Sequence, residues 1–176
     1  KLFNREFLIR NNLLLNDNLT AAEDAEFMLR TAFYADRVSF VAKSLYNYLH
    51  NTVSAVRSFR TDYVERYRKS LSVMYDFLVD NGLSKHLVTY DNCVLYHLLL
   101  IVVNYSFNPA RGDTKKEQIA AFKKLVKDPF FANAMKSLRL KDFSMTRKIT
   151  LICIKLKMYR MVRLIALFRQ KQTGTS

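Results

Sequence analysis

Helical periodicity is clearest between residues 59 and 81, which read FRTDYVERYRKSLSVMYDFLVDN. Apolar and tyrosine side chains recur there every three or four residues, a spacing that places them on one face of an α-helix. These side chains are Tyr63, Tyr67, Leu71, Met74, Tyr75 and Leu78. The Asn81-Gly82 pair that follows is a typical helix C-terminus. The stretch therefore predicts a long amphipathic helix with the tyrosines in the protein core.

The composition extends this prediction to most of the chain. Three glycines and two prolines in 176 residues are too few turn formers for a many-stranded sandwich or barrel. Further helices are expected at residues 5–11, 21–35, 84–107 and 114–127, and a short one after Asp128-Pro129. Asn4 is expected to cap the first of these helices, and Thr114 with Glu117 to form a capping box for the helix at 114–127. The inner face of the helix at 21–35 is expected to consist of Phe27, Leu29, Ala32 and Phe33. We therefore predict a mainly α fold.

Residues 38–48 differ from this helical background. Their Val-Ser-Phe-Val opening and the Leu-Tyr-Asn-Tyr stretch at 45–48 are rich in the β-branched and aromatic residues that strands favour. Lys43-Ser44 reads as a turn between the two parts. The sequence thus predicts one short β-strand or hairpin here.

The most apolar run, residues 93–103, has eleven residues, about half the length of a bilayer-spanning helix. Polar residues flank it on both sides, so we expect a buried core helix. Cys93 and Cys153 lie in apolar runs and are expected to be free thiols in a reducing compartment. Cysteines and histidines show no metal-ligand spacing, and no glycine-rich phosphate loop is present, so no metal or P-loop site is expected in this sequence.

The net charge of +14 is concentrated near the C-terminus. Residues 1–113 hold 13 Lys and Arg against 12 Asp and Glu, residues 114–142 hold 8 against 3, and residues 143–176 hold 8 against none. This imbalance predicts an anionic partner for the last third of the chain, either lipid headgroups or nucleic acid. Nucleic acid is the less favoured partner, because its binding motifs and aromatic stacking platforms are missing.

Residues 147–171 are predicted to form a single basic amphipathic helix. Its apolar stripe consists of Ile154, Met158, Met161, Ile165 and Phe168, and four cations lie off that stripe. This pattern is typical of a helix that lies on an anionic membrane surface. The alternative, a stripe packed on the rest of the domain with solvated cations, fits the pattern equally well.

Residues 1–57 resemble the acceptor-side end of the catalytic domain of a family-2 glycosyltransferase. The matching elements, in order, are Lys1-Leu2-Phe3-Asn4-Arg5, Glu23-Asp24-Ala25-Glu26-Phe27 (similar to a Glu-Asp-x-x-Phe motif), Leu45-Tyr46-Asn47-Tyr48 and Ser54. Their order and spacing carry the resemblance, which covers about a third of the chain. It implies that residues 1–57 end the catalytic domain and that residues 58–176 are a helical extension.

The resemblance also implies a chemistry. Such enzymes have an A-type α/β fold that binds a nucleotide-diphospho-sugar, with Mg or Mn held by an Asp-x-Asp motif. That motif has no equivalent here, so the donor-binding half and its metal are expected before Lys1, and this piece alone is expected to be inactive. By the same resemblance Asp24 is the general base of an inverting transfer, and Glu23 contacts the acceptor or holds the loop. His50 and Arg57 are candidates for contacts with the donor phosphates.

The same residues have simpler interpretations. Thr20 followed by Glu23 is a capping box, and an acidic first helical turn is common. A glycine often precedes the family's Glu-Asp, whereas this chain has Ala22. A lone histidine after a strand, such as His50, is more often structural or exposed, and the alternative for Arg57 is a solvated side chain.

We expect the C-terminal part of a bacterial-type glycosyltransferase that builds surface polysaccharide. It is expected to be cytoplasmic and peripheral on the inner face of the cell membrane through residues 147–171. The alternative is a non-enzymatic basic helical domain that binds a membrane surface or a partner protein. The sequence indicates neither the donor sugar and acceptor nor the oligomeric state.

Overall fold

The computed structural model describes residues 1–46 and 59–173, and every regular element within these ranges is a helix. The α-helices are α1 (Arg5–Arg10), α2 (Glu23–Tyr34), α3 (Tyr63–Asp80), α4 (Leu87–Ile101), α5 (Lys115–Lys127), α6 (Pro129–Lys136), α7 (Met145–Lys155) and α8 (Tyr159–Thr173). A π-helical turn, Val102–Ser106, extends α4, and short 3-10 turns link other helices. The predicted mainly α class is therefore confirmed.

The strand predicted at residues 38–48 is wrong for residues 38–46, and residues 47 and 48 lie outside the described ranges. Val38, Phe40 and Tyr46 are 85%, 91% and 81% exposed. No strand exists among the described residues to pair with this segment. Strand propensity largely reflects packing against neighbouring strands, so a β-rich composition without a sheet leaves the segment irregular.

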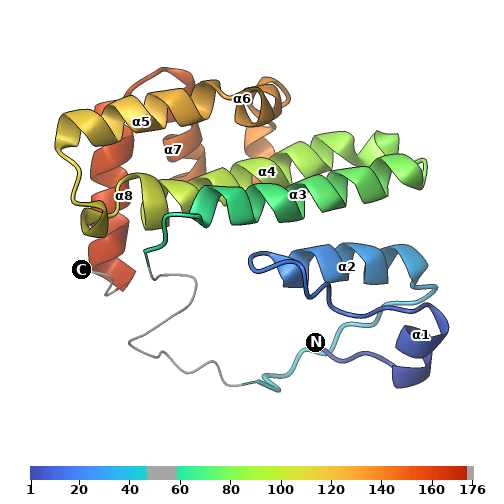
Figure 1. Cartoon of the computed structure of the whole chain (residues 1–176). Coiled ribbons are helices and arrows are strands. Elements are labelled where there is room, and N and C mark those ends of the chain that lie inside the picture. The colour runs from blue at the N-terminus through green and yellow to red at the C-terminus, as the bar shows by residue number, and fades with distance from the viewer. Residues whose placement is uncertain (47–58, 174–176) are drawn as a thin grey trace.

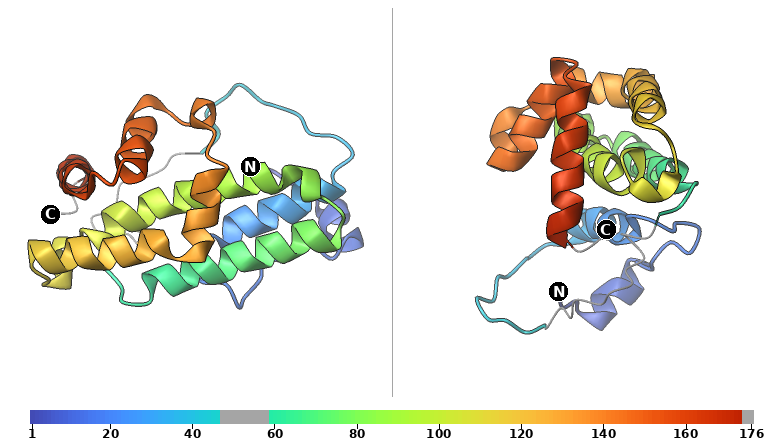
Figure 2. Two further views of the ribbon diagram at one scale, coloured as in Figure 1. Left: turned by 90° about the horizontal axis from the view of Figure 1, so that it is seen from above. Right: turned by 90° about the vertical axis from the view of Figure 1, so that its left-hand side faces the viewer.

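The pair formed by α3 and α4 is the centre of the fold (Figure 1). α2 packs against α3 on one side, and α5, α6 and α7 lie on the other side of the pair (Figure 1). α8 crosses one end, where it contacts α5, α7 and the π-helical turn (Figure 2). The fully buried core residues come from these layers and include Leu71, Leu95, Leu98, Phe107, Phe122, Phe131 and Leu151.

The most apolar stretch of the sequence forms the central helix. By length and composition, the helical stretch Ser84–Ser106 could cross a membrane. In the fold, 44% of its most apolar part is buried. Val94, Leu95 and Ile101 on α4 are at most 1% exposed and contribute to one continuous core. The burial of this stretch agrees with the core helix predicted at residues 93–103.

Several predicted helix ends are confirmed. Gly82 follows α3 with a φ of +68°, the left-handed conformation that favours glycine. At the start of α5, the backbone N–H of Glu117 donates to the Thr114 hydroxyl, and the Thr114 N–H donates to the Glu117 carboxylate, which completes the predicted capping box. The side chains of Asn4 and Asp128 cap α1 and α6.

The single helix predicted at residues 147–171 is wrong, because α7 ends at Lys155 and α8 begins at Tyr159. Lys157 lies in the turn with a φ of +58°. The N–H of Met158 donates to the carbonyl of Cys153 at 2.8 Å, which closes a helix-ending turn of the kind usually marked by glycine. Since a lysine occupies the left-handed position, no glycine or proline in the sequence marks this break.

Candidate functional site

The first turn of α2 carries both acidic residues of the Glu-Asp motif. Asp24 is exposed, and its Oδ1 accepts a hydrogen bond from the N–H of Ala25 at 2.8 Å. Its carboxylate forms no ion pair within residues 1–46 and 59–173. Glu23 is partly buried beside it. The carboxylate of Asp24 is therefore accessible to a hydroxyl group that approaches from solvent.

The capping box predicted between Thr20 and Glu23 is wrong. The N-cap residue of α2 is Ala22, whose methyl side chain cannot accept a hydrogen bond. The Thr20 hydroxyl instead accepts a hydrogen bond from Nε of Arg66 on α3 at 2.6 Å. The Arg66 guanidinium also donates to the Thr20 carbonyl, and the Ser70 hydroxyl donates to the carbonyl of residue 21. Two side chains of α3 thus fasten the loop that leads into the acidic turn.

Ala22 has an unusual backbone conformation. Its φ of 54° and ψ of 24° lie in the left-handed region, which costs a residue with a Cβ about 1 kcal/mol. The strained position lies directly before Glu23 and Asp24, where the resembled family often has glycine. Ala22 therefore adopts a backbone conformation that favours glycine, although the sequence supplies alanine.

Replacement of Ala22 with glycine is expected to raise the free energy of unfolding by about 0.5 kcal/mol, because glycine relieves the strain but adds entropy to the unfolded chain. Urea denaturation measures the change as a shift in midpoint at constant slope. The matched control is Ala25→Gly inside α2, which is expected to destabilise the protein by about 1 kcal/mol. Equal destabilisation by both substitutions would contradict the strain at Ala22.

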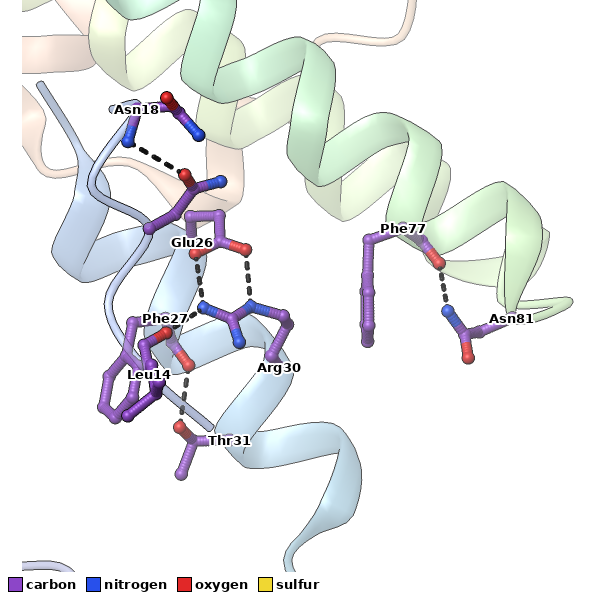
Figure 3. Close-up of polar contacts among 9 residues, drawn as sticks. Leu14, Asn18, Glu26, Phe27, Arg30, Thr31, Phe77 and Asn81 are labelled. Atoms are coloured by element: carbon purple, nitrogen blue, oxygen red, sulfur yellow. Dashed lines mark hydrogen bonds and ion pairs between the residues drawn. The ribbon is translucent and has the colours of Figure 1, made fainter. Parts of the chain in front are cut away.

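A buried ion pair holds α2 to the preceding loop (Figure 3). Glu26 is only 3% exposed, and its two carboxylate oxygens accept hydrogen bonds from Nε and Nη2 of Arg30 at 2.5 and 2.9 Å. Nη2 of Arg30 also donates to the carbonyl of Leu14 at 2.6 Å. One turn further along α2, the hydroxyl of Thr31 donates to the carbonyl of Phe27 at 2.7 Å. These contacts set how α2 lies against the loop before it.

The inner face predicted for α2 is only partly correct. Phe27 and Leu29 are partly buried, but Ala32 and Phe33 are exposed. Buried positions on this helix are polar, as Glu26 and Thr31 show. The spacing of apolar residues cannot identify this face, because its buried positions are occupied by polar side chains.

The charges of Glu23 and Asp24 contribute to the pKa values of two buried side chains, Tyr67 on α3 and His97 on α4. Burial lowers the pKa of His97, while the hydrogen bond to Cys93 and the charge of Asp24 partly oppose that change. Nδ1 of His97 donates to the Cys93 carbonyl at 2.8 Å. Burial raises the pKa of Tyr67, and Tyr63 and Glu23 raise it further. Both groups are therefore neutral near pH 7, and the acidic turn lies near an uncharged, buried region.

The structure brings together two of the four predicted site residues, Glu23 and Asp24, which are also neighbours in sequence. His50 and Arg57 lie outside the described residues. Sequence reasoning missed Arg66 and Ser70, because they lie 46 and 49 residues from their partners and have no local motif. Among the residues that the structure describes, no group of three or more His, Cys, Asp or Glu is placed to hold a metal ion.

Comparison with known proteins finds no matching family model, no matching curated protein and no matching solved structure. The functional assignment of the acidic turn therefore depends on its geometry and on the motif resemblance of residues 1–57.

Proposed function

We propose that this chain is the C-terminal part of an inverting family-2 glycosyltransferase, with Asp24 as its general base. One observation carries the proposal. Ala22 adopts a left-handed conformation at the position where the family often has glycine, two residues before Asp24 and its exposed carboxylate. The motif and the backbone conformation are independent features, and both fit the family.

The proposed reaction needs a base that is exposed yet firmly positioned. The Asp24 carboxylate takes the proton of the acceptor hydroxyl as that oxygen attacks the anomeric carbon of the donor sugar. The bond from this carbon to the phosphate oxygen breaks, and the nucleoside diphosphate leaves with the electron pair. Arg66 and Ser70 hold the loop before Asp24, so the direction of attack is set by the fold. Glu23 contacts the acceptor in this proposal.

The surface of residues 1–46 fits a segment that the rest of a catalytic domain covers. Leu2, Val38 and Phe40 are 88%, 85% and 91% exposed, and Leu2 and Val38 line the same hollow, as expected of apolar side chains that a further part of the protein covers. We place the donor-binding half, with its nucleotide-diphospho-sugar and its Mg or Mn ion, before Lys1. No group of three or more His, Cys, Asp or Glu among the described residues could hold that ion, so the proposal assigns its ligands to the donor-binding half.

The test is a transfer assay on the protein that includes the residues encoded before Lys1. A panel of nucleotide sugars is offered with magnesium or manganese and with saccharide or lipid-linked acceptors. We expect release of the nucleoside diphosphate that requires the metal and depends on Asp24. A folded protein that binds and turns over no donor would contradict the proposal.

A non-enzymatic helical domain is the second candidate, and the unbalanced charge of residues 143–176 favours it. The coding sequence before Lys1 separates the two candidates. An Asp-x-Asp motif after a hydrophobic strand, within about 200 residues of alternating strands and helices, favours the enzyme. A start codon directly before Lys1 favours the helical domain.

A further inference from the structure

A basic hollow of about 700 Å³ lies between α5 and the turn that leads into α8. Lys123 and Lys127 of α5 line one part of it, and Lys157 and Arg160 line the other. No acidic residue lines it, and none of these four cations pairs with a carboxylate among the described residues. The nearby Asp128 is engaged elsewhere, by Arg68 at 3.0 Å. The hollow therefore presents uncompensated positive charge.

The hollow is also lined by apolar and aromatic side chains, which lie beside its cations. Nζ of Lys123 lies 5.7 Å from the centre of the Tyr159 ring, which is 9% exposed. Met158 and Met161 also line the hollow and are 44% and 43% exposed. The first turn of α8 lies at this edge, so the positive end of its helix dipole adds to the field of the side chains. Such a site suits an anionic group attached to apolar chains.

Exposed apolar rows lie on α7 and on α8, the two helices that are joined by the turn that lines the hollow. On α7 and the turn after it, one row consists of Met145, Ile149, Ile152 and Leu156, at helical spacing. On α8, a second row consists of Met161, Leu164 and Phe168, opposite the buried face of Tyr159, Val162 and Ala166. α5, α7 and the start of α8 lie on the side of α4 away from α2 (Figure 1).

We propose that this surface, formed by the basic hollow and the two apolar rows, docks the chain on a membrane rich in anionic phospholipid. Lipid phosphates are held at the hollow, and the exposed methionine, leucine and phenylalanine side chains enter the interface between headgroups and acyl chains. Pairing with a second copy is disfavoured, because residues 143–176 carry eight cations and no acid. Binding of nucleic acid would account for the cations but not for the exposed apolar rows. The docking does not depend on the role of Asp24.

The test measures binding of the chain to vesicles of phosphatidylglycerol and phosphatidylcholine in equal parts, and to vesicles of phosphatidylcholine alone. We expect binding to the anionic vesicles only, with an affinity that falls as salt increases. The triple variant K123Q/K127Q/R160Q is expected to lower the partition coefficient roughly 100-fold, at about fivefold for each cation. The matched control K43Q/K69Q/K85Q removes equal charge from exposed positions away from the hollow and is expected to lower it less than about threefold.

A second variant, Met161→Ser with Leu164→Ser, separates apolar insertion from simple charge attraction. It is expected to weaken vesicle binding while leaving the helical circular dichroism unchanged. Absence of binding at low salt would overturn the proposal, and so would equal losses in the two triple variants. Sedimentation of the chain alone provides a further check. If the chain forms dimers that this double variant disrupts, and binds no vesicles, the surface is a contact between copies instead.

Discussion

Replacement of Asp24 with asparagine is expected to lower sugar transfer about a thousandfold, the usual contribution of a general base. The substitution keeps the shape of the side chain and leaves an oxygen that can accept the Ala25 N–H, so the first turn of α2 is retained. The measurement is the turnover rate at saturating donor and acceptor, in the protein that includes the residues encoded before Lys1. Circular dichroism and thermal unfolding establish that the variant is folded.

The matched control is Glu65→Gln, which neutralises another exposed acid in the first turn of a helix, α3. It is expected to change turnover less than about twofold, since surface charges away from the reacting atoms contribute little. Undiminished turnover by Asp24→Asn would remove Asp24 from the mechanism. Equal losses in both variants would indicate that turnover depends on the overall negative charge of the acidic residues and not on Asp24 as a base. Neither result bears on the proposed membrane docking, which depends on other residues.

The helices that could be predicted from the sequence are those whose periodicity and caps depend on residues close together in the chain. The stripe of residues 63–78 and the left-handed Gly82 define α3, and the reciprocal bonds of Thr114 and Glu117 define the start of α5. Each signal acts within a few residues, so the sequence alone contains it. The same holds for the apolar run of α4, which had to be buried in the core or within a membrane.

The features that could not be predicted depend on distant partners or on an unmarked backbone conformation. Residues 38–46 have strand composition but no described strand beside them. Lys157 breaks the terminal helix in a left-handed conformation that a lysine rarely adopts, so periodicity continued through the break. The basic hollow was missed for the same reason, because it forms only where the break brings α8 against α5.

The candidate site shows the same division. Glu23 and Asp24 were predicted from a short motif, and the structure places both in the first turn of α2. The contacts that hold this turn come from Arg66 and Ser70 on α3, whose roles become visible only when the two segments pack together. The burial of Glu26 was also unexpected, since a glutamate in an acidic turn is normally solvated.

Replacement of Glu26 with alanine is expected to lower the free energy of unfolding by about 3 kcal/mol, because it leaves a partly buried guanidinium without its carboxylate. The Glu26 side chain is 4% exposed and that of Arg30 is 19% exposed, so water cannot fully replace the lost bonds. The loop carbonyl of Leu14 also loses a firmly oriented donor. Urea denaturation measures the loss, and the matched control is Asp62→Ala in the exposed Arg60–Asp62 pair, which is expected to show no measurable change.

A double substitution tests whether the loss comes from the charge that remains. Glu26→Met together with Arg30→Met removes both ions and fills the space with apolar side chains, so its stability is expected to lie within about 1 kcal/mol of the native protein. The single variants Glu26→Met and Arg30→Met complete the cycle, and the difference between the effect of the double variant and the sum of their effects is the coupling energy of the pair. If the double variant is as unstable as Glu26→Ala, the contribution of Glu26 comes from packing of α2 against the loop, and the ion pair is not its cause. If it is stable, the loss in Glu26→Ala comes from the Arg30 guanidinium left without its carboxylate, and apolar packing can replace the ion pair between α2 and the loop.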